Sequence, residues 1–224
     1  MQKAMIMAIL FTVGALGAFA QGNYQELKDK AQGLCNAQQW KDAEKVLKDA
    51  MNAASNDKEK SEALLLLANC HFYSNSLDKA EQDVEKLLAL KIENTQAKIK
   101  VLTLQAQIYS RTKRHEQAFK SYEIILALPE LEKSDRFSAL LGKAEALMFM
   151  DKREETLPII EQVVSDGDAS SDIKALALLL KFHIQCGQGM KDEARKALED
   201  VINSPASEGL KDRAKILLKD MKKD

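Results

Sequence analysis

A repeat of about 38 residues constrains the fold of this chain more than any other feature. Five small residues, which we call the anchors, follow one another at separations of 37, 38, 38 and 38 residues: Ala43, Ala80, Ala118, Thr156 and Ala194. The residue sixteen positions before each anchor is leucine in all five repeats. One short repeat cannot bury its apolar side chains alone, so such repeats stack on their neighbours.

The apolar pattern within each repeat is helical on both sides of a short break. In the second repeat, Leu64, Leu67, Ala68 and His71 follow the i, i+3, i+4, i+7 spacing of one helix face. The residue twelve positions before the anchor is also small in the first four repeats, whereas the fifth repeat has Phe182 there. With only 9 Gly and 3 Pro in 224 residues, an all-β fold is disfavoured. The sequence therefore predicts an all-α superhelix of about five helix-turn-helix repeats.

The expected organisation is a signal segment over residues 1–20 and one α-solenoid domain over residues 21–224. The repeats are expected at residues 24–55, 57–92, 95–130, 134–167 and 171–204, followed by a capping helix at 205–223. Side chains typical of N-caps stand at Asn56, Asn94, Ser134 and Ser204. Pro205 would then be the first residue of the capping helix.

Glycine stands in the turn of the fifth repeat, at Gly189, where a left-handed backbone is expected. Asn75 and Asp151 occupy the corresponding position in the second and fourth repeats and tolerate that conformation better than most residues. Pro158 would disrupt the second turn of a helix that began at Arg153. We expect that helix to begin later, near Glu155, or to be kinked.

The pattern resembles the tetratricopeptide repeat family over roughly residues 24–206. The family's usual period is 34 residues, so the longer period here implies longer loops between repeats. The resemblance implies a concave groove, lined by the first helix of each repeat, that holds a peptide or a partner helix. Eleven, eight and seven residues before the anchors, it implies partner-binding positions at Asn69, Phe72, Tyr73, Gln107, Arg111, Glu145, Met148 and Phe149. Phe72 and Phe149 could equally pack toward the next repeat.

The first twenty residues have the layout of a secretory signal. Lys3 is followed by an almost wholly apolar stretch, and Ala18-Phe19-Ala20 supplies the small residues that a signal peptidase reads. Cleavage is expected before Gln21, which gives a periplasmic or secreted protein. The alternative is an uncleaved membrane anchor, for which the apolar segment is short.

The three cysteines, Cys35, Cys70 and Cys186, do not form a disulfide framework. An oxidising compartment would allow one bridge and one free thiol. The interpretation we favour is three separate buried thiols that pack as small hydrophobic groups.

Motifs for catalysis, nucleotide binding or metal binding are missing from the sequence. His71, His115 and His183 lie about a repeat or more apart, which does not suit a metal site. Asp42, Glu44, Glu81 and Asp83 have lysine neighbours at helical spacing, so we expect surface ion pairs. We expect no cofactor, no metal and no enzyme activity.

Lys and Arg number 33 against 34 acidic residues, a balance that disfavours nucleic-acid binding. We expect a scaffold or adaptor in the cell envelope that binds a protein or peptide and does not insert in the membrane after signal cleavage. The alternatives are the solenoid part of an envelope polymer-processing enzyme and a membrane-anchored adaptor. The sequence specifies neither the partner nor the oligomeric state.

Signal cleavage predicts a mature protein that begins at Gln21. The intact mass of the protein purified from its native host should therefore lack the contribution of residues 1–20. A full-length mass would instead support the membrane-anchored adaptor.

Overall fold

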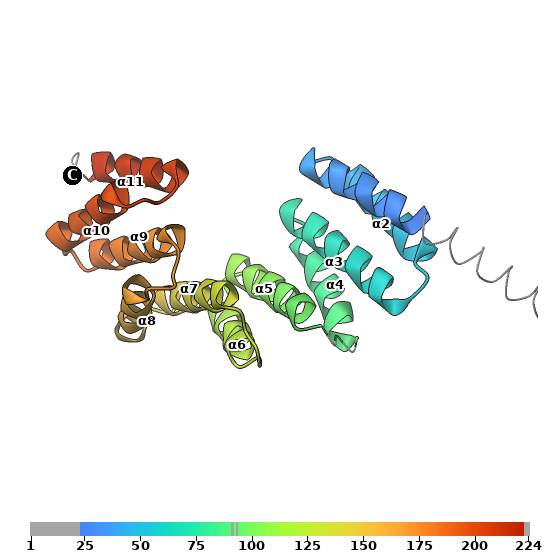
Figure 1. The fold of residues 1–224 in the computed structure, drawn as a ribbon, viewed down its shortest axis with the longest axis horizontal. Coiled ribbons are helices and arrows are strands. Elements are labelled where there is room, and N and C mark those ends of the chain that lie inside the picture. Colours follow the sequence, from blue (N-terminus) through green and yellow to red (C-terminus); the bar gives the residue numbers. More distant parts are fainter. Residues whose placement is uncertain (1–22, 91, 93, 222–224) are drawn as a thin grey trace, which may run out of the picture. The chain divides into compact units, whose positions relative to one another are not determined.

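The computed structural model describes residues 23–90, 92 and 94–221, and the predicted signal segment lies outside them. These residues form helices joined by short connections, without a strand among them, which confirms the predicted all-α solenoid (Figure 1). A helix over residues 23–36 comes first. It is followed by α2 (Trp40–Ala53), α3 (Asp57–Tyr73), α4 (Leu77–Ala89), α5 (Thr95–Arg111), α6 (His115–Leu126), α7 (Lys133–Phe149), α8 (Arg153–Ser165), α9 (Ser171–Gly187), α10 (Lys191–Asn203) and α11 (Glu208–Asp220).

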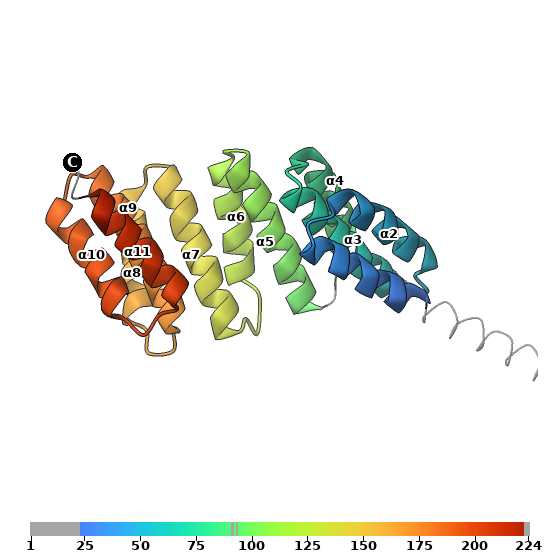
Figure 2. The ribbon, with the colours of Figure 1, turned by 90° about the horizontal axis from the view of Figure 1, so that it is seen from above.

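The chain divides between residues 93 and 94 into two compact units, which we call the N-terminal and C-terminal units. In the C-terminal unit, α7 contacts both α5 and α9, and α9 also contacts α11. By contrast, within the described residues α6, α8 and α10 contact only the helices next to them in the chain. The first helices of the C-terminal repeats therefore form one continuous layer, and Figure 2 shows the successive helices of this unit side by side.

The anchors lie on the second helix of each repeat, and in the second to fifth repeats this helix packs against the first helix of the same repeat. All five anchor residues are fully buried, as are the small residues twelve positions before the first four of them. Thr156 is accommodated because its hydroxyl donates a hydrogen bond to the Lys152 carbonyl at 2.8 Å. Phe182, which replaces the small residue of the fifth repeat, lies in a core cluster with Ala194 and Leu198.

A left-handed residue closes the first helix of every repeat. The positions are Gln38, Asn75, Lys113, Asp151 and Gly189, with φ between 57° and 74°. The following residue donates a backbone hydrogen bond across the turn, for example from Ser76 to His71 at 2.8 Å. This is the bond of a Schellman motif, in which carbonyls at the helix end are satisfied. The left-handed conformations predicted for Asn75, Asp151 and Gly189 are confirmed.

Two of the four expected N-caps are present. Asn56 Oδ1 accepts from the Glu59 amide at 2.9 Å, and Asn94 Oδ1 accepts from the Ala97 amide at 2.8 Å. Ser134 is not an N-cap, because α7 begins one residue earlier, at Lys133.

Ser204 is not an N-cap either. Its hydroxyl donates to the Val201 carbonyl at 2.8 Å and accepts from the Ala206 amide at 3.2 Å, so it closes α10. The final helix α11 begins only at Glu208, and Pro205 lies in the connection.

The expected later start of α8 is wrong: this helix begins at Arg153 and contains Pro158. The proline forfeits one backbone hydrogen bond near the helix N-terminus. Full burial of Ile160 and Val163 against the neighbouring helices holds the segment in place. In the described part of the chain, each helix is too short or too polar to cross a bilayer.

One glycine marks a close approach between α6 and α7. A Cβ at Gly142 would lie only 2.2 Å from Cζ of Tyr122, a residue of α6 that is 7% exposed. The absence of a side chain at residue 142 therefore makes room for the Tyr122 ring.

Gly142→Ala should lower the free energy of unfolding by about 1–3 kcal/mol, because the Tyr122 ring must move out of a packed site. Gly33→Ala is the matched control, since nothing lies within 4 Å of a Cβ built at this helical glycine. It should raise stability by up to about 1 kcal/mol through helix propensity. Urea unfolding followed by circular dichroism measures both changes, and equal effects would contradict the packing described.

Candidate functional site

In the N-terminal unit, three predicted partner-binding residues lie near the end of α3. Asn69 is half-buried, and its side-chain amide donates to the Leu65 carbonyl at 2.8 Å. Phe72 lies in the core at 6% exposure, whereas Tyr73 is 60% exposed. Only Asn69 and Tyr73 therefore present substantial surface to a partner.

In the C-terminal unit, the other predicted residues lie on the adjacent helices α5 and α7. Gln107 and Arg111 of α5 are exposed, as are Glu145 and Phe149 of α7. Met148 is partly buried against the core cluster formed by α7, α8 and α9. An amide, a cation, an anion and an aromatic ring are thus displayed on one layer of helices.

The same layer continues on α9, where no partner-binding residue was predicted. Eleven and eight residues before Ala194 stand His183 and Cys186, and both are exposed. Although His183 is exposed, partial loss of hydration around its ring lowers its pKa, and the positive charge of Arg213 lowers it further, so the uncharged imidazole is favoured at neutral pH. The anchor spacing alone would have located these two residues.

Exposed aromatic residues at the ends of first helices stack on the preceding repeat. Tyr73 stacks on Trp40, the first residue of α2, with 6.2 Å between ring centroids. Phe149 makes the equivalent contact with His115, the first residue of α6, at 4.8 Å. These rings therefore join successive repeats and still expose more than half of their surface.

A polar cluster lies between α2, α3 and α4 in the N-terminal unit. His71 Nδ1 is 2.8 Å from Asp83 Oδ2, and both side chains are buried. The other ring nitrogen, Nε2, is buried without a hydrogen bond, 3.5 Å from Glu44 Oε2. The Lys48 ammonium, hydrogen-bonded to Glu44 at 2.8 Å, holds the pKa of that carboxyl below its ordinary value.

This cluster corrects the expectation of a surface ion pair at Asp83, which is only 4% exposed. The carboxylate accepts from Lys86 at 2.9 Å through its other oxygen, so both of its oxygens are satisfied. Within the described residues, no group of three or more ligand-type side chains is arranged to hold a metal ion. The cluster therefore serves as a polar contact between helices.

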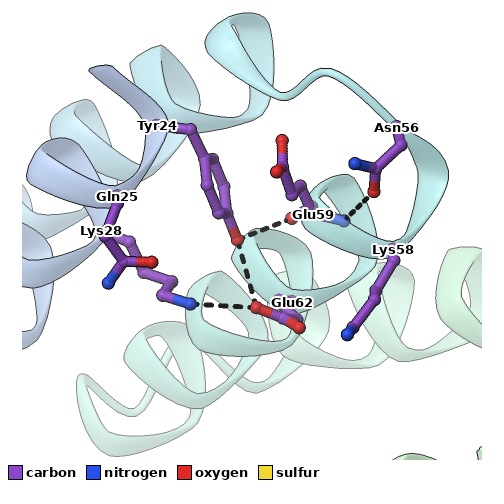
Figure 3. Close-up of a pocket in the computed structure, with 7 residues that line it drawn as sticks. All are labelled: Tyr24, Gln25, Lys28, Asn56, Lys58, Glu59 and Glu62. Carbon is purple, nitrogen blue, oxygen red and sulfur yellow. Dashed lines mark hydrogen bonds and ion pairs between the residues drawn. The ribbon is translucent and has the colours of Figure 1, made fainter. Parts of the chain in front are cut away.

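A cavity of about 330 Å³ lies where the helix over residues 23–36 meets the start of α3 (Figure 3). The Tyr24 hydroxyl donates to the Glu59 carbonyl at 2.9 Å, and Lys28 pairs with Glu62 at 2.9 Å. Burial raises the pKa of Tyr24 well above its ordinary value, with Glu62 adding to the shift, so the phenol stays protonated. These groups tie the first two repeats together and provide no activated nucleophile.

One family model and several solved structures are similar to this chain. Residues 99–128, which include most of α5 and all of α6, match the family model of the tetratricopeptide repeat. No curated protein sequence matches the chain.

Two of the solved structures that are similar to this chain contain the TPR-like repeats of a Podosopora anserina protein described as a putative kinesin light chain. One of them, a variant with a single substitution, is 17% identical, covers 83% of this chain and 93% of that chain, and has a TM-score of 0.64. The other is 17% identical over 83% and 94%, with a TM-score of 0.62. A tetratricopeptide repeat protein from Parabacteroides merdae is 16% identical over 90% and 99%, with a TM-score of 0.41. The two Podosopora anserina structures share the fold of stacked helical hairpins with this chain.

Asp83→Ala should lower the free energy of unfolding by about 1–3 kcal/mol, because it leaves His71 buried without its hydrogen-bond partner. Lys86→Ala removes the exposed partner of the same carboxylate and should change stability by less than about 0.5 kcal/mol. Chemical denaturation at neutral pH compares the two. A similar loss of stability in both variants would show that the buried contact between His71 and Asp83 contributes no more than the exposed pair of Lys86 and Asp83.

Proposed function

We propose that this chain, whose fold is that of tetratricopeptide-like repeats and whose residues 99–128 match the family model, is a non-enzymatic scaffold that binds another protein. Repeats of this kind generally serve as binding platforms. The observation that carries the proposal is the layer formed by α5, α7 and α9, which contact one another in series and display exposed polar and aromatic side chains.

The binding surface on this layer comprises Gln107, Arg111, Glu145, Phe149 and His183, which we call the layer surface. We infer that it is the concave face and that it holds a peptide or a helix of the partner. Helices that contact one another directly along one side of a solenoid are closer together than those on the other side, so the array curves toward them. Arginine and aromatic side chains are the usual affinity anchors of such surfaces.

The scaffold is proposed to act in the cell envelope after export and loss of residues 1–20. The support for this location is the signal-like pattern that ends in Ala18-Phe19-Ala20. Exposed residues of the layer surface carry both signs of charge, which suits a protein partner better than a polyanion.

An envelope polymer-processing enzyme is less well supported. The cluster of Glu44, His71 and Asp83 is the grouping closest to an acid–base set, but His71 and Asp83 are almost fully buried. A polymer substrate could not reach them without separation of the helices. The observations therefore favour binding over catalysis.

The partner can be captured from an envelope extract of the native host and then tested as a purified protein by calorimetry. The double variant Gln107→Ala, Glu145→Ala should weaken binding about tenfold or more, because it truncates two exposed side chains of the layer surface.

The control is Glu116→Ala, Lys120→Ala, which removes an exposed ion pair on α6 and should leave the dissociation constant within about twofold. Equal binding by both double variants would place the partner elsewhere. Failure to recover any partner under mild conditions would count against the scaffold itself.

A further inference from the structure

Two of the three thiols lie together in the N-terminal unit. The contacts of Tyr24 with Glu59 and of Lys28 with Glu62 join residues 34 or 35 positions apart on the helix over residues 23–36 and α3. Cys35 and Cys70 stand at the same separation near the ends of these two helices, and each thiol influences the pKa of the other. The Cys70 thiol is also 3.3 Å from the Trp40 carbonyl, just beyond the turn that follows Cys35. The two cysteines thus belong to consecutive repeats but influence each other.

We propose that Cys35 and Cys70 are a redox-sensitive pair that a disulfide oxidant converts to an intramolecular disulfide. The bridge would join the first repeat to the second by a covalent bond. This inference is independent of the binding surface, which lies in the C-terminal unit.

The burial of the two sulfurs sets the order of the reaction. Cys35 is half-buried, whereas Cys70 is 2% exposed, so an oxidant reaches Cys35 first. Its thiolate attacks one sulfur of the oxidant disulfide, the S–S bond breaks, and one thiolate leaves. Cys70 then loses its proton to solvent and attacks the Cys35 sulfur, releasing the second thiolate. Two protein thiols lose two protons and two electrons, and the oxidant is reduced to two thiols.

The local backbone permits the small closing movement. A disulfide needs the two sulfurs about 2 Å apart, closer than a hydrogen-bonded contact between thiols. Cys35 is the penultimate residue of its helix, and its carbonyl accepts from the Gln38 amide in the turn. Cys70 lies in the last turn of α3, so both cysteines stand near helix ends, which adjust more easily than the middle of a packed helix.

The protonation state of the pair makes the reaction slow at neutral pH. Burial raises the pKa of the Cys70 thiol to about 12, with the neighbouring Cys35 thiol contributing. Burial also raises the pKa of Cys35, while the neighbouring Cys70 side chain opposes the shift. Because the thiolate is the nucleophile, oxidation should accelerate up to about tenfold per pH unit on the alkaline side of neutrality.

Cys186 must be removed for a clean test, because this third thiol is exposed on α9. The full chain carrying Cys186→Ser is incubated with oxidised glutathione between pH 7 and pH 9. We expect loss of both titratable thiols, an intact mass lower by about 2 Da without a glutathione adduct, and a proteolytic fragment that links residues 35 and 70. The midpoint of thermal unfolding should rise by about 5 °C or more, and dithiothreitol should reverse the change.

Cys35→Ser in the same background is the matched variant, since serine replaces the sulfur at a half-buried site with little change in volume. It should keep its single thiol and show no oxidant-dependent rise in melting temperature. A stable glutathione adduct at Cys35, covalent dimers, or two free thiols after incubation at pH 9 would each overturn the proposal. A bridge that forms without any thermal shift would overturn its stabilising role.

Discussion

The close crossing of two helices at a residue without bulk is the contact on which this structure depends. Each anchor is fully buried, and the larger side chain four residues later is almost fully buried beside it, as with Leu47 after Ala43 and Leu198 after Ala194. A small residue lets the helix backbones approach, and its neighbours then fill the remaining space at the density of a protein interior. Because the crossing recurs about every 38 residues, successive hairpins meet in nearly the same way within each unit.

Periodicity made the fold predictable, because buried positions in a repeat protein recur with the repeat. The anchors, the leucine positions and three of the left-handed turns could all be predicted from this spacing. The left-handed backbone at Gln38 and Lys113 could not be predicted from the residue type, since neither glutamine nor lysine favours that conformation. The N-cap predicted at Ser204 was wrong because a hydroxyl near a helix end also bonds to nearby carbonyls, as Ser204 does with Val201. The N-cap predicted at Ser134 was wrong because α7 begins one residue earlier, at Lys133.

The environments of polar side chains were harder to predict, since they depend on contacts between helices. Asp83 has lysine neighbours at helical spacing, as an exposed acid would, but its partner His71 lies on another helix. Tyr73 and Phe149 were assigned to partner binding, and each also stacks on the preceding repeat. The interaction between Cys35 and Cys70 joins residues of two repeats at different distances from their anchors, so no single column of the repeat reveals it.

The contacts of α11 determine how the C-terminal end of the chain opens. Among the described helices, α11 contacts only α10 and α9, and Ala214 is its one fully buried residue. Its amide protons should therefore exchange with solvent through local fraying, long before those of α7, which has packed helices on both sides. Protection from exchange would then rise from helix to helix toward the middle of the unit, as in a stack whose last member has a neighbour on one side only.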